Sequence, residues 1–259
     1  MIESSPRQVA PLILVVAGDP SGDLHASRLI AALKRRDPVC RVAAVGGPLC
    51  RAVADEFLED LASRGVTGFW EPVLKIPFLL ALGRRLGRFL TERRPNALVC
   101  VDYYGFNRRV LPLAQAAGVP AFYFVSPQVW ASRPGRVAVL KRFVEKMLVI
   151  FPFEEKIYRD AGVPVEFVGH PLLDLIEPQK AASSVSSSSS GIALLPGSRY
   201  SEIKRHLPLF FHAFKSLRST RPGLRGLLFA APSQPDSAYG ELPEGVELVR
   251  DQDYSRRGS

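Results

Sequence analysis

The chain has 259 residues, of which 47% are hydrophobic and 23% charged; this length fits one large or two modest domains, and this composition excludes a disordered or fibrous protein. Its 34 Lys and Arg against 25 Asp and Glu give a net charge of +9, which favours an anionic partner such as nucleic acid, nucleotide phosphates or an acidic membrane surface. The cysteines Cys40, Cys50 and Cys100 lack the spacing of zinc ligands and predict neither a metal site nor a disulfide framework.

The first apolar run, residues 11–17, predicts a strand buried on both faces, and the glycine-rich turn at residues 18–23 leads from it into a helical pattern. This order is typical of a doubly wound parallel sheet, and a second strand at 41–45 also ends in glycines. Both turns would lie at the ligand edge, although each is equally compatible with an ordinary βα turn. Because Glu3 precedes the first run, we interpret it as a strand rather than a signal peptide and expect a cytosolic protein. No run reaches the roughly 18 apolar residues of a membrane-spanning helix.

Residues 73–94 combine an apolar stripe with many arginines. Read as a helix after Pro77, they repeat apolar side chains at three- to four-residue spacing and place arginines at the polar positions. Such a helix can lie on an anionic bilayer, or it can be a packed crossover helix with a solvated arginine face. Under the first interpretation, the predicted membrane contacts are Phe78, Leu79, Leu82, Arg84, Arg85, Leu86 and Arg88.

A third buried strand is predicted at residues 97–101, and Asp102 follows it directly. An acid at the carboxyl end of a parallel strand faces the ligand edge and is well placed to be a general base. Helix capping and turn formation are alternative roles for the same residue.

The next predicted strand, residues 121–125, is followed by a proline-flanked loop that contains Trp130 and, close behind, Arg133 and Arg136. These side chains suggest one wall of a polar pocket, or a tryptophan that fixes the loop to the core. Further strands are predicted at 146–151 and 165–168, and His170 lies just past the last of them, where it could donate a hydrogen bond to a ligand or remain solvated.

The composition then changes. Residues 176–190 contain a serine run typical of a flexible linker. Residues 191–205 (GIALLPGSRYSEIKR) predict a strand, a sharp turn and a helix, and the free backbone N–H groups at that helix start could hold an anion beside Ser198 and Arg199. The same stretch is equally compatible with an ordinary βα turn and a solvated arginine. Only two or three strands are predicted in 191–259, too few for a complete doubly wound domain.

Five separated segments, taken together and in this order, resemble the lipid-A-disaccharide synthase family. They are AGDPSGDLHASRLIAALK (17–34), VDYYGFNRRVLPLA (101–114), YFVSPQVWASRPGRV (123–137), FPFEEKIYRDAGVPVEFVGHPLLD (151–174) and LLPGSRYSEIKRHLP (194–208).

The resemblance implies a GT-B glycosyltransferase of the α/β class, with two Rossmann-like domains built on parallel sheets. Residues 1–175 would form the acceptor-side domain, 176–190 the linker, and 191–259 an incomplete UDP-sugar domain. The implied reaction needs no metal or cofactor: UDP-2,3-diacylglucosamine reacts with 2,3-diacylglucosamine 1-phosphate to give a β-1,6-linked disaccharide 1-phosphate and UDP. The protein would lie peripherally on the anionic, cytoplasmic surface of the inner membrane.

Residue roles follow from the same resemblance. Asp102 matches the family aspartate proposed as the general base. Arg199 matches an arginine that would stabilise the leaving UDP or hold the acceptor phosphate. The remaining matching positions expected to bind substrate are Ser21, Gly22, Asn107, Trp130, Arg133, His170 and Ser198.

The chain also departs from the family pattern. Gly105 stands where a second aspartate is common, Ser132 stands where a second tryptophan is common, and no counterpart of the family's glycine- and glutamate-containing UDP-sugar segment occurs before Ser259. Two alternatives therefore stay open: a GT-B transferase for another UDP-sugar, and an inactive membrane-associated fragment that binds the acylated acceptor. No nucleic-acid-binding motif occurs, so we expect no nucleic acid partner.

Overall fold

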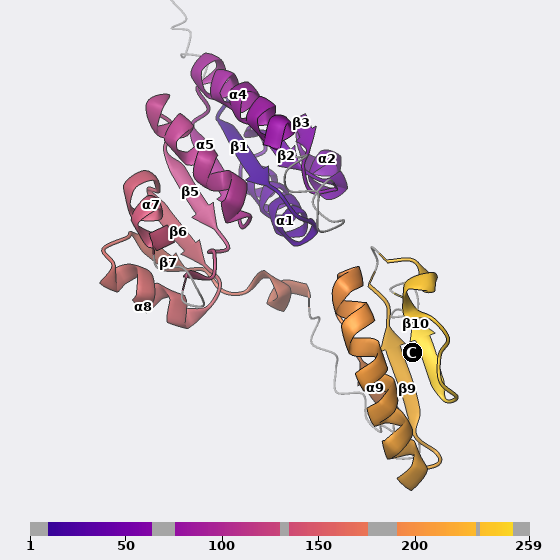
Figure 1. Ribbon diagram of the computed structural model, residues 1–259. Coiled ribbons are helices and arrows are strands. Elements are labelled where there is room, and N and C mark those ends of the chain that lie inside the picture. The colour runs from indigo at the N-terminus through magenta and orange to yellow at the C-terminus, as the bar shows by residue number, and fades with distance from the viewer. Residues whose placement is uncertain (1–9, 64–75, 130–134, 176–190, 232–233, 251–259) are drawn as a thin grey trace, which may run out of the picture. The chain divides into compact units, whose positions relative to one another are not determined.

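The structure is a computed structural model, and it describes residues 10–63, 76–129, 135–175, 191–231 and 234–250. The chain divides into two compact units, Met1–Glu177 and Pro178–Ser259. Each unit is built on its own parallel sheet, and the two are described separately (Figure 1).

The described part of the first unit contains a seven-stranded sheet in the order β3-β2-β1-β4-β5-β6-β7, with every neighbouring pair parallel. The order reverses between β1 and β4, which is where ligands bind in doubly wound folds. The strands are β1 (Leu12–Ala17), β2 (Arg41–Gly46), β3 (Glu56–Asp60), β4 (Ala97–Val101), β5 (Ala121–Phe124), β6 (Lys146–Val149) and β7 (Val165–Phe167).

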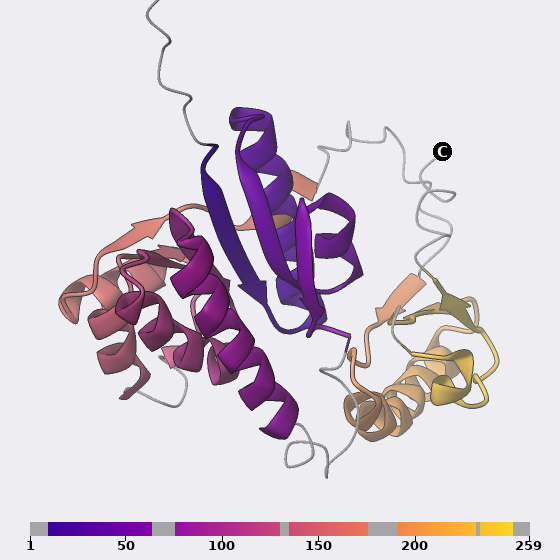
Figure 2. The same cartoon turned by 90° about the horizontal axis from the view of Figure 1, so that it is seen from above.

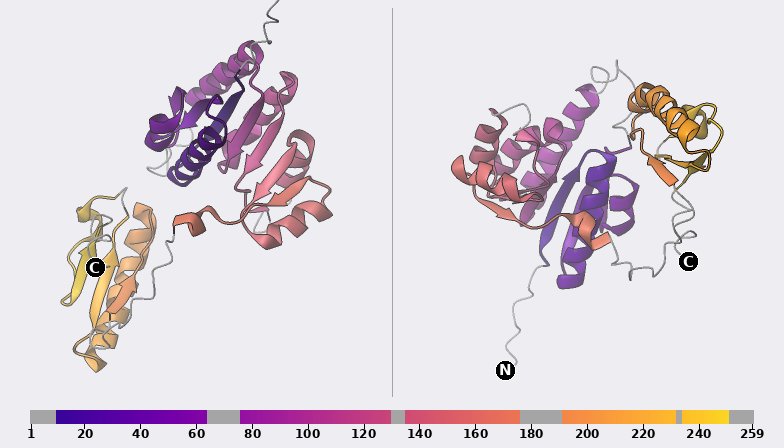
Figure 3. Two further views of the ribbon diagram at one scale, coloured as in Figure 1. Left: turned by 180° about the vertical axis from the view of Figure 1, so that it is seen from behind. Right: turned by 90° about the horizontal axis from the view of Figure 1, so that it is seen from below.

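Helices pack on both faces of this sheet (Figures 2 and 3). One face carries α4, α5, α7 and α8 and the other carries α1 and α2, as the two separate core clusters show. Seen from behind, α1 lies in front of the strands (Figure 3, left). The bounds are α1 (Pro20–Arg36), α2 (Pro48–Val53), α4 (Ile76–Arg93), α5 (Tyr104–Ala116), α7 (Gly135–Phe143), α8 (Pro152–Asp160) and the 3-10 helix η1 (Pro171–Leu175).

The two-sided burial predicted for the first strand is confirmed. Along β1, Leu14 and Val16 belong to one core cluster, while Val15 and Ala17 belong to the other. All four side chains are fully buried because successive residues of a strand point to opposite faces and both faces are covered. The predicted α/β fold with a parallel sheet is therefore confirmed for this unit.

The helix α4 corrects part of the expected membrane-contact set. Leu82 is 3% exposed and Leu86 fully buried, and both pack in the core with Phe78 and Leu79 at its margin. Leu82 and Leu86 therefore face the sheet and are wrong as membrane contacts. The arginines Arg84, Arg85 and Arg88 are exposed, as is Leu80. Among the described residues, no helix has the length and apolar character needed to cross a bilayer.

The second unit has a three-stranded parallel sheet in its described part, in the order β10-β9-β8. The helix α9 covers one face of it, and Ile203 and Leu207 pack there against Leu194 and Leu228 (Figure 1). The bounds are β8 (Gly191–Leu194), α9 (Tyr200–Thr220), β9 (Arg225–Phe229), the 3-10 helix η2 (Asp236–Tyr239) and β10 (Val246–Val249).

Candidate active site

The carboxyl ends of three neighbouring strands meet at one edge of the large sheet. Ala17 at the end of β1 pairs with Val101 at the end of β4, and Val101 pairs with Phe124 at the end of β5. The first glycine-rich turn, Asp102 and the loop that begins at Val125 therefore emerge side by side. This is the edge at which doubly wound sheets bind ligands.

The glycine-rich turn after β1 serves mainly to start a helix. Asp19 is the N-cap of α1, and its Oδ1 accepts hydrogen bonds from the Gly22 backbone N–H at 2.6 Å and from the Ser21 hydroxyl at 3.0 Å. Gly22 is buried and Ser21 exposed. The polar groups of the two predicted substrate-binding residues of this turn are thus engaged with Asp19.

A close contact joins this turn to the residue after Asp102. A Cβ atom placed on Gly18 would lie 2.0 Å from Cδ1 of Tyr103, so the aromatic ring rests directly on the glycine. Glycine is needed at position 18 because any side chain there would collide with the ring.

The backbone at Asp102 has a conformation unusual for residues other than glycine. Both Asp102 and Tyr103 have positive φ, 45° and 42°. The Asp102 N–H donates to Phe124 O at 3.0 Å, and its carbonyl accepts from Asn107 Nδ2 at 2.8 Å and from the Tyr123 hydroxyl. Asn107 is fully buried, so it holds the Asp102 backbone in place and its side chain does not reach the pocket surface.

The Asp102 side chain lines a pocket of about 360 Å³ together with Tyr104, Gln128 and Arg136. Burial, reinforced by the negative charge of Asp19 and partly opposed by a hydrogen bond from the Tyr103 backbone, raises the pKa of Asp102 to about 6. A carboxyl with this pKa is still ionised at neutral pH and holds a transferred proton far better than an ordinary aspartate.

Arg136 was predicted to belong to the wall of a polar pocket, and it does line this one; Tyr104 and Glu154 were not singled out from the sequence. The Arg136 guanidinium lies 4.8 Å from the centre of the Tyr104 ring and adds a cation to the wall. The buried Glu154 accepts a hydrogen bond from the Ser126 hydroxyl at 2.5 Å and one from the Phe151 N–H at 3.2 Å, which ties the loop after β5 to the start of α8. Tyr104 and Glu154 each follow a predicted strand end by three residues, which is the sequence signal that could have identified them.

The second glycine turn is occupied by a protein carboxylate. Asp23 of α1 is buried and accepts backbone hydrogen bonds from Gly47 at 2.7 Å and from Leu49 and Cys50 at 3.0 Å. These donors lie at the start of α2, so Asp23 satisfies its free N–H groups. The second glycine turn therefore has a structural role, as an ordinary βα turn does, and its N–H groups are not free for a ligand.

His170 is not among the residues that line the Asp102 pocket. Its ring centroid is 6.5 Å from that of His25 on α1 and 5.3 Å from that of Phe151. Phe151 also lines the Asp102 pocket. Of the other predicted site residues, Trp130 and Arg133 lie outside the described residues.

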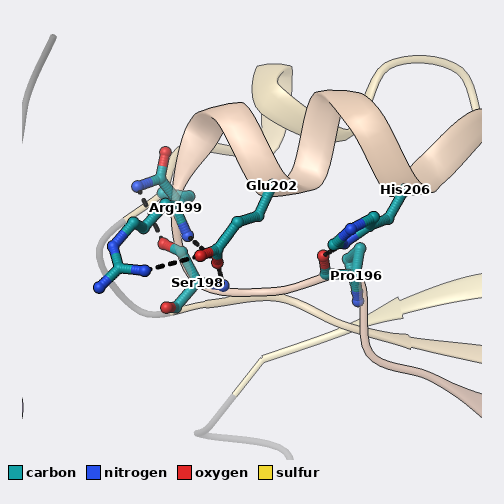
Figure 4. Close-up of polar contacts among 6 residues, drawn as sticks. Pro196, Ser198, Arg199, Glu202 and His206 are labelled. Atoms are coloured by element: carbon teal, nitrogen blue, oxygen red, sulfur yellow. Dashed lines mark hydrogen bonds and ion pairs between the residues drawn. The ribbon is translucent and has the colours of Figure 1, made fainter. Parts of the chain in front are cut away.

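In the second unit, Ser198 and Arg199 lie at the start of α9, and Glu202 occupies the expected anion position (Figure 4). Its Oε2 accepts from the backbone N–H groups of Ser198 and Arg199, both at 3.2 Å, and its Oε1 pairs with Arg199 Nη1 at 2.7 Å. The hydrogen bonds from Arg199 lower the pKa of Glu202. A substrate anion would have to displace this carboxylate.

The turn before α9 requires glycine at position 197. The φ of Gly197 is +120°, and a Cβ atom there would lie 2.8 Å from Glu202 Oε2, which is too close. His206 Nδ1 lies 2.7 Å from Pro196 O and helps to fix the same turn (Figure 4). In the described part of the chain, no group of three or more His, Cys, Asp or Glu side chains is placed to hold a metal ion.

Comparison with known proteins shows which sequences this chain is similar to. The sequence model of the lipid-A-disaccharide synthetase family matches residues 13–246. The lipid-A-disaccharide synthase of Trichlorobacter lovleyi is 40% identical over 242 residues, which are 91% of this chain and 63% of that protein. The synthase of Myxococcus xanthus is 41% identical over 86% of this chain and 60% of its own length. This chain thus spans less than two thirds of the length of these relatives.

Solved structures show the same fold at low sequence identity. UDP-GlcNAc 2-epimerase from Neisseria meningitidis, bound to UDP-GlcNAc, matches 94% of this chain and 73% of its own, with a TM-score of 0.63 and 11% identity. The calicheamicin glycosyltransferase CalG4 matches 94% of this chain and 71% of its own, with a TM-score of 0.56 and 16% identity. The fold is therefore the GT-B class, with a second sheet that is small and incomplete.

Proposed function

This chain belongs to the lipid-A-disaccharide synthase family, and from that premise we propose that it acts as a glycosyltransferase of lipid A biosynthesis. The donor in this proposal is UDP-2,3-diacylglucosamine and the acceptor is 2,3-diacylglucosamine 1-phosphate. Residues 1–175 serve the acceptor, and residues 191–259 supply part of the donor side after the linker at 176–190.

The bond changes of the proposed reaction balance with one base and one leaving group. The acceptor hydroxyl oxygen attacks the anomeric carbon of the donor and forms the new β-1,6 glycosidic bond. The bond from that carbon to the diphosphate oxygen breaks with inversion, and UDP leaves with the electron pair. The hydroxyl proton passes to the base.

The observation that carries the proposal is the position of Asp102. Its carboxyl lines a pocket at the carboxyl edge of the sheet, and its pKa of about 6 leaves it ionised at neutral pH. A base must be unprotonated when the acceptor binds and must retain the proton after attack, and both conditions hold for this carboxyl. Arg136 in the same pocket is available to an anionic part of a substrate.

In the second unit, Arg199 is the residue proposed to contact phosphate. Its side chain is 70% exposed and is paired with Glu202, so binding of the UDP diphosphate requires exchange of that carboxylate for the ligand. The helix start adds two backbone N–H groups, from Ser198 and Arg199, once Glu202 has moved.

A membrane location accompanies the proposed substrates, which carry acyl chains. The exposed surface of α4 combines Leu80 with Arg84, Arg85 and Arg88. Arginines beside an apolar side chain suit the surface of an anionic bilayer. We therefore infer peripheral association with the cytoplasmic face of the inner membrane through this surface.

The direct test is release of UDP by the purified chain from the diacylated donor and acceptor. We expect turnover that depends on both substrates and falls by at least about a hundredfold in Asp102→Asn, because loss of general-base catalysis typically costs about 10²- to 10⁴-fold. Glu145→Gln, which alters an exposed carboxylate outside the Asp102 pocket, is the control and should leave turnover unchanged.

Two results would redirect the proposal. Turnover with another UDP-sugar, but none with the diacylated donor, would assign the chain to a different transferase. Acceptor binding without any turnover would favour the second candidate, an acceptor-binding chain without transferase activity. That candidate is supported by Glu202, which already occupies the two backbone N–H groups at the start of α9.

A further inference from the structure

A second concave surface of the first unit lies apart from the Asp102 carboxyl. It is a groove of about 510 Å³ between α1 and residues 168–174, which follow β7. Leu29 of α1 and Leu148 of β6 contribute apolar walls, and Leu173, which is 67% exposed, lies at its margin. Contact with an apolar ligand would remove the exposed Leu173 side chain from water, which is favourable in free energy.

The charged side chains of the groove are two arginines, Arg28 and Arg35, and one carboxylate among the described lining residues, Asp174. His25 and His170 line the groove beside them. This balance favours an anion.

The groove contains a close pair of histidines, His25 and His170. Their ring centroids lie 6.5 Å apart, and within the described residues the buried His25 Nδ1 has no hydrogen-bond partner. Burial lowers the pKa of His25, and the neighbouring His170 and Arg28 lower it further, whereas Asp19 raises it. An anion placed between the rings would supply the missing partner and offset the repulsion.

The groove is also next to the Asp102 pocket. Phe151 lines that pocket, and its ring centroid lies 5.3 Å from that of His170. One ligand that passes Phe151 could therefore occupy both surfaces. Such a ligand needs a hydroxyl at one end and, at the other, an anionic group with an apolar chain beside it.

We propose that this groove binds the phosphate and one acyl chain of the acylated sugar-phosphate acceptor. His25, Arg28 and His170 contact the phosphate, and Leu29, Leu148 and Leu173 contact the chain. This assignment rests on the proposed function for the identity of the ligand, whereas the chemistry of the groove stands without it. Arg28 and His25 are thereby substrate-binding residues that the sequence motifs did not single out.

Dodecyl phosphate is a suitable probe because it combines the two recognised groups. Its dissociation constant, measured by titration calorimetry below its micelle concentration, is expected to rise about tenfold in Arg28→Gln, which removes a cation from the groove. Ala32→Trp, at an exposed lining position of α1, should weaken binding at least as much by filling the groove. Arg36→Gln removes the same charge from the same helix outside the lining residues and should have no effect.

The chemistry of the ligand is tested with two compounds, each of which carries only one of the two groups of dodecyl phosphate. Inorganic phosphate and the uncharged detergent dodecyl maltoside should each bind at least tenfold more weakly than dodecyl phosphate. The groove assignment is overturned if Arg28→Gln behaves like Arg36→Gln, or if Ala32→Trp binds the probe normally. Circular dichroism melting of each variant verifies that the fold is retained.

Competition identifies the source of the anion. The diacylated acceptor should displace dodecyl phosphate, and dispersed phosphatidylglycerol should not; the reverse result would overturn the acceptor assignment. Where the chain turns over, Ala32→Trp should raise KM for the acceptor and leave KM for the donor unchanged. Turnover that Asp102→Asn abolishes but Ala32→Trp does not affect would retain the function and reject the groove. Normal binding of dodecyl phosphate without any turnover would retain the groove assignment and reject the proposed function.

Discussion

At the scale of single residues, Asp102 shows how a site can reduce the stability of the fold that contains it. Burial and the charge of Asp19 raise the pKa of its carboxyl from 3.8 to about 6. The folded state therefore binds the proton more tightly than the unfolded state. This preference stabilises the folded state below pH 4 and is lost as the pH rises through 6.

Replacing this carboxyl should accordingly stabilise the protein. A shift of about two pKa units corresponds to about 3 kcal/mol of unfavourable ionisation at neutral pH, and Asp102→Asn removes it. We expect a higher free energy of unfolding for Asp102→Asn than for the parent at pH 7.5, and little difference at pH 4, in urea titrations. Glu145→Gln should show no such pH-dependent gain, and an equal gain in both variants would contradict the explanation.

The Glu202 carboxylate stabilises the start of its own helix, and it does so with the same groups that would bind a ligand anion. It already occupies the two backbone N–H groups and the Arg199 guanidinium. Glu202→Gln removes the competing charge, so we expect tighter binding of UDP together with a lower melting temperature of the second unit. Glu244→Gln, which removes the partner of Arg218 in the same unit, should not tighten UDP binding.

The opposite outcome for Glu202 is equally informative. If Glu202→Gln bound UDP more weakly, the carboxylate would be orienting Arg199 for the ligand rather than competing with it. Calorimetric titration with UDP at low ionic strength distinguishes the two, since screening by salt weakens exposed charge interactions.

The sequence predicted the position of Asp102 because a buried apolar strand directly precedes it. It did not predict that Asp19 would raise the pKa of this carboxyl. Asp19 lies 83 residues before Asp102 in the chain, and only the parallel pairing of β1 and β4 brings their segments together. Asn107 was predicted to bind substrate, whereas its burial and its bond to the Asp102 carbonyl assign it to the backbone.

At the scale of elements, strands buried on both faces were predictable and an edge strand was not. The strand β3 (Glu56–Asp60) has the sequence EFLED, is half-buried throughout and pairs only with β2 in the described sheet. Its acids form ion pairs with α4, Glu56 with Arg93 at 3.3 Å and Glu59 with Arg85 at 3.4 Å. Charges on an edge strand obscure the apolar pattern that identifies a central strand.

The helix α4 carries the prediction about membranes. Arg84, Arg85 and Arg88 are exposed, and each charge near an anionic surface contributes about 1 kcal/mol. Replacing all three with serine should weaken binding to vesicles of phosphatidylcholine and phosphatidylglycerol by more than about tenfold in a sedimentation assay. Phosphatidylcholine vesicles alone should show no difference.

A matched control separates location from net charge. Arg108, Arg109 and Arg142 are exposed residues of α5 and α7, and replacing them with serine removes the same total charge. Equal losses in the two triple variants would mean that the +9 charge of the whole chain, rather than α4, drives binding. Unchanged binding in the α4 variant would leave α4 as a packed helix with a solvated face.

At the scale of the whole molecule, the two units differ in how completely they enclose a core. The seven-stranded sheet has helices on both faces, whereas the described part of the second unit has α9 against three strands. The chain also spans only 60% to 66% of the length of its first relatives. The UDP-release assay therefore tests both the chemistry of Asp102 and the sufficiency of this second unit.

The contact between Gly18 and the Tyr103 ring makes the pocket depend on the pairing of two strands. The two residues are 85 positions apart in the chain, and they meet because β1, which ends at Ala17, pairs with β4, which ends at Val101. A side chain at position 18 would displace the Tyr103 ring, and with it the adjacent backbone of Asp102, even in a sheet that forms normally.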